Sequence, residues 1–142
     1  MKADKKSATD EQLDQVIGEL ETLAVPVIRV ECGALVPGHA KEWIDFKRHG
    51  WKYKHLRLFE SLTSTDELLA LCFERIQNWN LTDAEGNAVP FQPWRLDPVS
   101  GAPIEGQYSS EGADELEPDV AGFIVSAFRT AYNLSSTPEK KE

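Results

Sequence analysis

The chain has 142 residues, of which 41% are apolar and 27% charged; these values are typical of one globular domain and exclude a disordered chain. No apolar run approaches the roughly 18 residues of a membrane span, and the charged N-terminus lacks the apolar segment of a signal peptide, so we expect neither. The net charge is −9, and residues 61–142 carry five basic against fourteen acidic residues, which argues against general nucleic-acid binding.

Helical periodicity begins after a polar N-terminus. Residues 1–8 are polar and rich in lysine, and we expect a flexible end there. Thr9 followed by Gln12 resembles a capping box, and apolar residues from Leu13 onward recur on one helical face. Because the residue before a proline avoids the helical conformation, Pro26 ends this pattern, which predicts a helix over residues 9–24.

A β-hairpin is predicted next. Val27–Glu31 is rich in β-branched residues and partly alternates, which predicts a strand with Arg29 and Glu31 on its solvent side. Pro37–Gly38 is a turn signal. Trp43–Phe46 fits either the returning strand or a short helical turn, and we interpret it as the strand.

Two helices are predicted after the hairpin. Apolar residues at helical spacing, with basic residues between them, predict a short helix from Trp51 to Ser61. Ser64 followed by Glu67 is a second capping box, and acidic residues in the first turn suit the helix dipole. The pattern therefore predicts a helix over residues 65–78, with apolar positions up to Trp79 facing the core.

The C-terminal half is predicted to contain one more helix. Residues 80–87 form a loop, and residues 88–114 hold four of the eight prolines without any periodicity, which predicts a long irregular excursion. Helical spacing then predicts a helix over residues 116–133, with Pro118 in its first turn, followed by a disordered tail at 135–142. The predicted fold class is a single α+β domain over residues 9–134, mostly helical, with a small β-hairpin and a long Pro/Gly-rich irregular loop.

The sequence contains no motif of catalysis or metal binding that we recognise. His39, His49 and His55 lack the i, i+4 spacing of a helical metal-binding pair. Cys32 and Cys72 are too few for a disulfide framework or a zinc site, and we interpret them as small buried groups in a reducing cytosol. The acidic turn after Leu81 lacks the glycine and glutamate positions of a calcium loop. We expect no catalytic, cofactor or metal site.

Basic and aromatic residues are interleaved between Lys47 and Arg57. This mixture has three interpretations: a solvated face whose lysines cover apolar surface, a protein-recognition patch, or a surface that stacks and neutralises single-stranded nucleic acid. The acidic remainder of the chain makes nucleic acid the weakest of the three. The candidate protein-interaction residues are Trp43, Trp51, Tyr53, Arg57 and Trp94.

The segment Ile76–Pro90 carries a resemblance to a known family. It ends the predicted helix in Trp-Asn-Leu-Thr-Asp and turns through Glu-Gly-Asn, and it resembles a pattern in small proteins of the siphophage and prophage tail-gene region, among them tail assembly chaperones. Trp43–Tyr53 and Leu116–Val120 resemble further parts of these proteins, whereas residues 91–112 depart from their shorter link. We interpret the motif as structural, with an indole packed under the loop and turn side chains bonded to nearby amides. Its residues are Trp79, Asn80, Asp83, Gly86 and Asn87.

The resemblance implies a non-enzymatic function. Tail assembly chaperones bind the long helical tape-measure protein until tail tube subunits cover it, so these tail proteins are the implied partners, in the bacterial host cytoplasm, with a homo-oligomer as a further option. The predicted helices 9–24, 65–78 and 116–133 would supply an apolar groove for such a helix. One rival is a minor virion subunit of the tail or head-tail connector. Another is a small enzyme or nucleic-acid-binding module built on Trp51, Tyr53 and Arg57. We expect no membrane partner.

Overall fold

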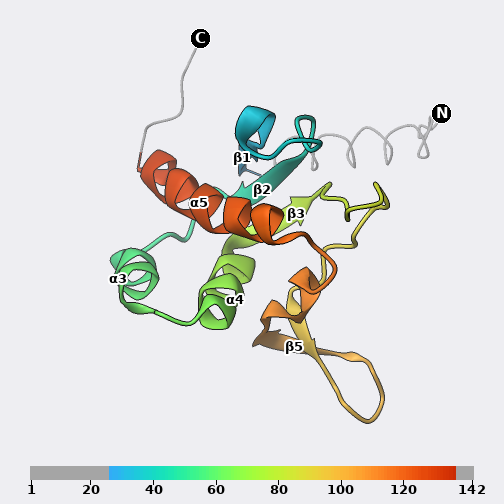
Figure 1. The fold of residues 1–142 in the computed structure, drawn as a ribbon. Helices are drawn as coiled ribbons and strands as arrows, with labels where there is room; N and C mark the ends of the chain where they lie inside the picture. Colours follow the sequence, from blue (N-terminus) through green and yellow to red (C-terminus); the bar gives the residue numbers. More distant parts are fainter. Residues whose placement is uncertain (1–25, 137–142) are drawn as a thin grey trace, which may run out of the picture.

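The computed structural model of the protein describes residues 26–136 (Figure 1). The predicted helix over residues 9–24, the N-terminus at 1–8 and the tail from residue 137 lie outside the described residues. Helices make up about 41% and strands about 23% of the structure, so the fold is a mixed α+β fold.

The central sheet has three antiparallel strands in the order β1-β2-β3. β1 (Val27–Glu31) pairs with β2 (Trp43–Lys47) along its whole length, which confirms the predicted hairpin. Arg29 and Glu31 are exposed as predicted. A short 3-10 helix, η1 (Gly33–Leu35), lies in the connection between the two strands.

The third strand corrects the predicted helix over residues 65–78. α4 (Thr65–Arg75) begins at the predicted cap, where the Ser64 hydroxyl accepts from the amide of Glu67. It ends at Arg75, because the next residue, Ile76, has an extended ψ of 137°. β3 (Ile76–Trp79) continues from there and pairs with β2, with a register shift between Asp45 and Phe46. This bulge places two exposed residues between two buried ones, so the apolar spacing of the strand equals that of a helix.

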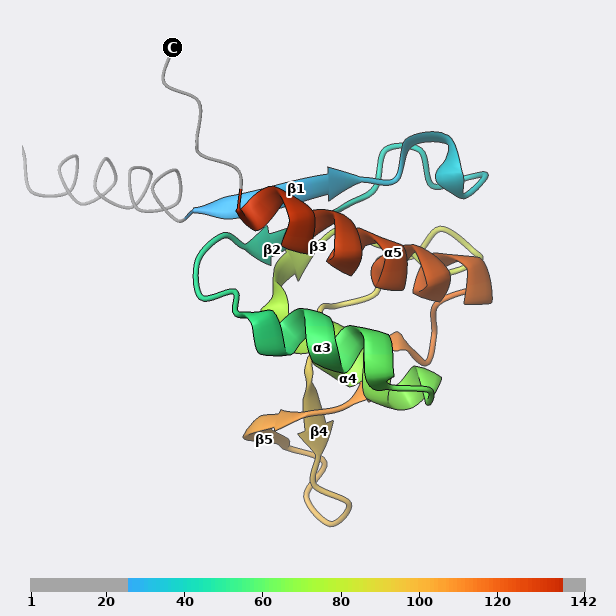
Figure 2. The same cartoon turned by 90° about the vertical axis from the view of Figure 1, so that its left-hand side faces the viewer.

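Among residues 26–136, one helix lies on the sheet and two further helices pack beside it. α5 (Pro118–Ser135) crosses one face of the sheet and contacts β1 and β2, and α3 (Tyr53–Ser61) and α4 pack beside it (Figures 1 and 2). The proline at the first turn of α5 is where the sequence placed it. Ser135, which the sequence assigns to the tail, is the last residue of this helix. Its hydroxyl donates to the carbonyl of Tyr132, three residues earlier.

One core lies between the sheet and the helices. The sheet supplies one part of its apolar side chains, and the helices α4 and α5 supply another. The largest fully buried side chains are Phe46, Phe73, Phe128, Ile44, Leu81 and Ile124.

The stretch 88–114, predicted to be irregular, contains a β-hairpin. β4 (Trp94–Leu96) pairs with β5 (Pro103–Tyr108), and the 3-10 helix η2 (Ser110–Ala113) leads back toward α5. The prolines do not interrupt the ladder, because Pro103 opens its strand and Pro98 lies in the turn, where no strand needs an amide donor. The hairpin projects from the body below α4 (Figures 1 and 2).

Candidate interaction surface

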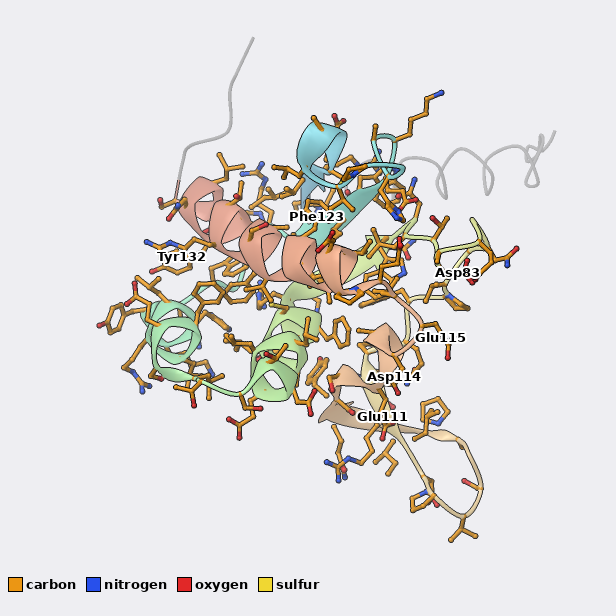
Figure 3. The ribbon with its side chains drawn as sticks, viewed as in Figure 1. Asp83, Glu111, Asp114, Glu115, Phe123 and Tyr132 are labelled. Atoms are coloured by element: carbon orange, nitrogen blue, oxygen red, sulfur yellow. The ribbon has the colours of Figure 1, made fainter. Side chains whose placement is uncertain are left out.

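A pocket of about 380 Å³ lies where α3 begins and α5 ends. Residues 48–53 form most of its wall, and Tyr132, Ser135 and Ser136 complete it; Figure 3 places Tyr132 between the end of α5 and α3. Arg48, His49 and Lys52 line it, and none of the described residues in its lining is acidic. We call it the basic pocket. It is built from the basic and aromatic stretch that the sequence singled out.

Trp51 is a packing residue of this region. Its indole lies edge-on to Phe128 with ring centroids 5.2 Å apart, and to Tyr132 at 5.9 Å. The indole N–H donates to the carbonyl of Lys47 at 2.6 Å. Only part of the Trp51 side chain therefore reaches the basic pocket, while the rest fixes the loop to α5.

An arginine and a histidine side chain are buried behind the pocket wall. Arg75 is 7% exposed, and its guanidinium donates to the carbonyl of His49 and lies 4.8 Å from the centroid of the Trp51 ring. Its Nε atom has no hydrogen-bond partner. His55 is also buried, and its Nδ1 accepts from the amide of Lys52 at 2.9 Å. Burial lowers the pKa of both Arg75 and His55, and the Arg75 charge lowers that of His55 further.

Tyr53 and Arg57 lie on the outer side of α3. Both are exposed, and Tyr53 retains 69% of its accessible surface. They stand one helical turn apart, so they present an aromatic ring and a guanidinium on neighbouring positions. Both side chains are exposed, and their role in binding a partner stays a prediction.

The other two candidate tryptophans lie elsewhere in the fold. Trp43 is half-buried at the start of β2, with the guanidinium of Arg29 3.8 Å from its ring centroid. Trp94 is half-buried on β4, and its indole nitrogen is buried without a partner. The five candidates therefore belong to the α3 region, the sheet and the projecting hairpin, and sequence composition alone does not reveal this separation.

The Trp-Asn-Leu-Thr-Asp segment is a structural unit, as interpreted from the sequence. Trp79 is buried and donates from Nε1 to the carbonyl of Val89 at 2.7 Å, although it does so from strand β3 instead of a helix end. Asp83 accepts from the amides of Glu85 and Asn87, both at 2.9 Å, and Gly86 adopts a φ of 86° in the same turn.

Asn80 corrects the prediction of a local turn contact. Its side-chain oxygen accepts from the amide of Trp43 at 2.6 Å, and its backbone amide donates to the carbonyl of the same residue. The side chain thus extends the β2–β3 pairing by one step beyond the end of the ladder. Because the two residues are 37 positions apart, nothing local in the sequence indicates this contact.

A buried polar cluster joins the sheet to the start of α5. His39 is 5% exposed, and its two ring nitrogens lie 2.8 Å from carboxylate oxygens, Nδ1 from Glu42 and Nε2 from Glu117. Glu42 also accepts from the amide of Thr82 at 3.2 Å and from its hydroxyl at 2.5 Å. The hydrogen bond to Glu117, followed by that to Glu42, raises the pKa of His39. Sequence reasoning missed this cluster.

The exposed apolar side chains are dispersed. Among residues 26–136, large exposed apolar groups occur on η1, on α3, on the β4–β5 hairpin and at the end of α5. The apolar faces of α4 and α5 lie in the core, so these two helices do not form the groove expected from the sequence. The exposed groups are Leu35, Tyr53, Leu96, Val99 and Leu134.

Comparisons with known proteins add no relative to this description. No family model matches the chain, and no significant match occurs among the curated proteins or the solved structures. Within the described part of the chain, no helix is both long and apolar enough to cross a bilayer. No group of three His, Cys, Asp or Glu residues in residues 26–136 is arranged to hold a metal ion.

Proposed function

We propose that this protein is a non-enzymatic assembly factor, a phage or prophage tail assembly chaperone that binds the tape-measure protein in the host cytoplasm and supports tail tube assembly. The resemblance of Ile76–Pro90 to small tail-region proteins supports the proposal. The side chains of Trp79, Asn80 and Asp83 in this segment bond to the protein's own backbone, and that of Thr82 bonds to Glu42, which is compatible with a scaffold for binding.

The observation that carries the proposal is the form of the β4–β5 hairpin. Val99 at its turn is 95% exposed, and Leu96 on β4 is 39% exposed. An apolar side chain displayed on a projecting element is typical of a contact with another polypeptide, because it gains free energy only when a partner covers it.

The turn is held in place by its own hydrogen bonds. The Asp97 carboxylate accepts from the amides of Val99 at 2.7 Å and Ser100 at 3.3 Å, and the Asp97 carbonyl accepts from the amide of Gly101 at 2.7 Å. The Asp97 amide donates to the carbonyl of Ala102 at 2.8 Å. A turn that is ordered before binding loses less conformational entropy when the partner arrives, so these bonds favour a recognition role.

The contact fits a helical partner that exposes an apolar stripe. Such a helix meets Val99 and Leu96 through its apolar side, and the charged groups at the edge of the stripe meet the polar turn. In this proposal the hairpin is the binding element, and the core helices keep their own contacts.

Co-expression tests the proposal. The full chain, produced together with a tape-measure protein from a phage tail gene cluster, is expected to raise the soluble yield of that protein. Val99→Asp should abolish the gain, because a desolvated carboxylate opposes the contact. Leu35→Asp is the matched control, since Leu35 is 69% exposed on η1 and should leave the gain intact.

Two results would contradict the chaperone function. One is an unchanged yield of soluble tape-measure protein with the full chain. The other is retention of the protein in purified phage particles, which would favour a minor virion subunit of the tail or head-tail connector, because a chaperone leaves the assembled particle.

A further inference from the structure

We infer that two copies of this chain associate through the outer edge of β1, as antiparallel strands related by a two-fold axis. β1 is an end strand of the sheet, because the strand order is β1-β2-β3. This association is independent of the chaperone function, since β1 and the β4–β5 hairpin lie at opposite ends of the molecule (Figure 2). Its tests use the purified chain alone.

The hydrogen bonds to β2 show which backbone groups of β1 face outward. At one end of the ladder the carbonyl of Pro26 accepts from the amide of Arg48, and at the other the amide of Cys32 donates to the carbonyl of Glu42. Hydrogen-bonded pairs alternate with non-hydrogen-bonded pairs in an antiparallel ladder, so every second residue of β1 turns its amide and carbonyl away from β2. Within residues 26–136 no hydrogen bond occupies these outward groups. They belong to Val27, Arg29 and Glu31.

An open strand edge is a template for a further strand, because its outward amides and carbonyls gain hydrogen bonds when that strand pairs. The other end strand, β3, exposes Gln77 and Asn78, whose neutral side chains favour no particular partner strand. β1 instead exposes Arg29 and Glu31. Its edge therefore carries charges that select a partner strand and a register.

The charges on β1 are complementary to those of a second copy. Arg29 and Glu31 are two positions apart, so they lie on the same exposed face of the strand. When two antiparallel copies pair around a two-fold axis through Val30, each arginine lies directly opposite the glutamate of the other copy. An axis through Arg29 or through Glu31 would oppose like charges, which destabilises a sheet. An axis through Ile28 would place Glu31 beyond the end of the other β1.

Both charged side chains have bonding capacity left. Nε and Nη2 of Arg29 donate to the carboxylate of Asp45 at 2.7 and 2.9 Å, whereas no hydrogen bond within residues 26–136 occupies Nη1. The Arg29 side chain remains 47% exposed. The carboxylate of Glu31 accepts no hydrogen bond from any residue in the same range. Pairing therefore extends a row of alternating charge from Asp45 through Arg29 to Glu31 of the second copy.

The apolar face of β1 also gains from the pairing. Val30 packs against the core but is only partly buried, whereas Ile28 is 3% exposed. On the axis, the two Val30 side chains face each other in a non-hydrogen-bonded pair, where side chains are closest. A second copy thus covers apolar surface that one copy leaves in water. Because two short strands bury less than the about 1,200 Å² of a standard interface, we expect a dimer that dissociates at micromolar concentrations.

Sedimentation equilibrium of the full chain, in a concentration series up to about 500 μM, tests the association. We expect the apparent mass to rise from 15.9 kDa toward twice that value. A mass that stays at 15.9 kDa at the highest concentration would overturn the inference. Growth beyond the dimer would overturn it as well, because a two-fold pairing of two edges is closed.

Amide hydrogen exchange tests the location of the contact. The outward amides of Val27, Arg29 and Glu31 are expected to exchange more slowly at high than at low protein concentration. The amides of Gln77 and Asn78 on β3 serve as the control and should exchange at one rate. Slow exchange of the β1 amides at every concentration would show that another part of the same chain covers this edge, and would overturn the pairing of two copies.

Glu31→Lys tests the complementary charges. It places a lysine opposite Arg29 of the second copy while the bond between Arg29 and Asp45 is kept, and we expect the dissociation constant to rise about tenfold. Glu85→Lys, an equal change of charge at an exposed turn residue, should leave the constant unchanged. Both variants lower the net negative charge, which by itself favours association. The same dissociation constant for the two variants would therefore contradict the assigned edge.

Val30→Cys tests the register, in a Cys32→Ala background that removes the nearest other thiol. Opposed residues of a non-hydrogen-bonded pair have Cα atoms about 4.5 Å apart, which is within the range of a disulfide. Glu31→Cys is the matched control: this more exposed position lies opposite Arg29, so its two thiols are too distant to bond. With diamide as the oxidant, we expect a covalent dimer from Val30→Cys alone. Efficient cross-linking of Glu31→Cys, or none of a Val30→Cys variant whose fold is verified by circular dichroism, would overturn the two-fold pairing.

Discussion

The cluster of His39 with Glu42 and Glu117 provides the sharpest prediction about stability. His39→Gln removes the ring whose two nitrogens contact the two carboxylates. Glutamine has a single nitrogen, so we expect it to keep a neutral hydrogen bond to one carboxylate. The variant therefore weakens the side-chain contact between the loop before β2 and the start of α5.

The size of the effect follows from burial. The bond to Glu42, whose carboxylate is 10% exposed, contributes about 1.5–3 kcal/mol as a buried charge-assisted bond. The bond to Glu117 contributes about 0.2–1 kcal/mol, because that carboxylate is 44% exposed and screened by water. Since glutamine keeps a neutral bond worth about 1 kcal/mol, we expect His39→Gln to lower the free energy of unfolding by about 2 kcal/mol below neutral pH.

The sign of the pH dependence is fixed by the direction of the pKa shift. The two carboxylates raise the pKa of His39 above the ordinary value of 6.5. The protonated ring thus stabilises the folded state fully below pH 6.5, and this stabilisation is lost as the pH rises through the raised pKa. In that window the free energy of unfolding falls by at most about 1.4 kcal/mol per pH unit, because one proton is involved.

His55 acts in the opposite direction. Burial lowers the pKa of His55 below 6.5, so the unfolded chain takes up a proton first and stability falls as the pH drops below that value. The His55 contribution is the same in the wild type and in His39→Gln. The difference between the two proteins in urea unfolding, measured from about pH 6 to about pH 9, therefore isolates His39.

Two results would refute this reasoning. The first is a difference between wild type and His39→Gln that stays constant or grows as the pH rises. The second is the same difference in His49→Gln, a control at an exposed histidine. As a supporting test, Glu117→Gln should move the NMR titration of the His39 ring back toward 6.5, since Glu117 is the largest cause of the raised pKa.

Three further predictions concern packing. Asn80→Ala should lower the free energy of unfolding by about 1 kcal/mol, because the amide of Trp43 loses its side-chain acceptor, whereas Asn80→Asp, which retains an acceptor, should cost less in the same urea titration. Gly112→Ala should destabilise by about 3 kcal/mol, because the added Cβ would lie 2.0 Å from a backbone carbonyl oxygen; Gly122→Ala, with open space around it, should stabilise by about 0.5–1 kcal/mol, and equal thermal shifts would contradict this pair. Both cysteines are buried and burial raises the pKa of both thiols, so Ellman's reagent should label them only after unfolding, and rapid labelling of the native protein would contradict their burial.

Local signals in the sequence predict the elements whose partners are close along the chain. The β1–β2 hairpin, the capped start of α4 and the proline-led start of α5 all follow from a few neighbouring residues. β3 does not, because its bulge gives Ile76 and Trp79 the spacing of a helix. Its conformation is instead decided by pairing with the free edge of β2, where Phe46, the partner of Ile76, lies 30 positions earlier in the chain. The sequence does not reveal the β4–β5 hairpin for a related reason. Its prolines lie at strand ends and in the turn, and Gly106 lies inside β5 with a φ of 87° where the register shifts, so these residues are compatible with pairing.

The same distinction explains the candidate sites. The exposure of Tyr53 and Arg57 follows from their positions on a short amphipathic helix, whereas the burial of Trp51 depends on Phe128 and Tyr132 at the far end of the chain. The contact between His39 and Glu117 spans 78 positions. No residue near His39 in the sequence indicates that contact. The folded structure alone shows that this histidine connects the loop before β2 to the start of α5. Residues whose role depends on distant contacts, such as Trp51 and His39, are therefore where structure adds most to the sequence.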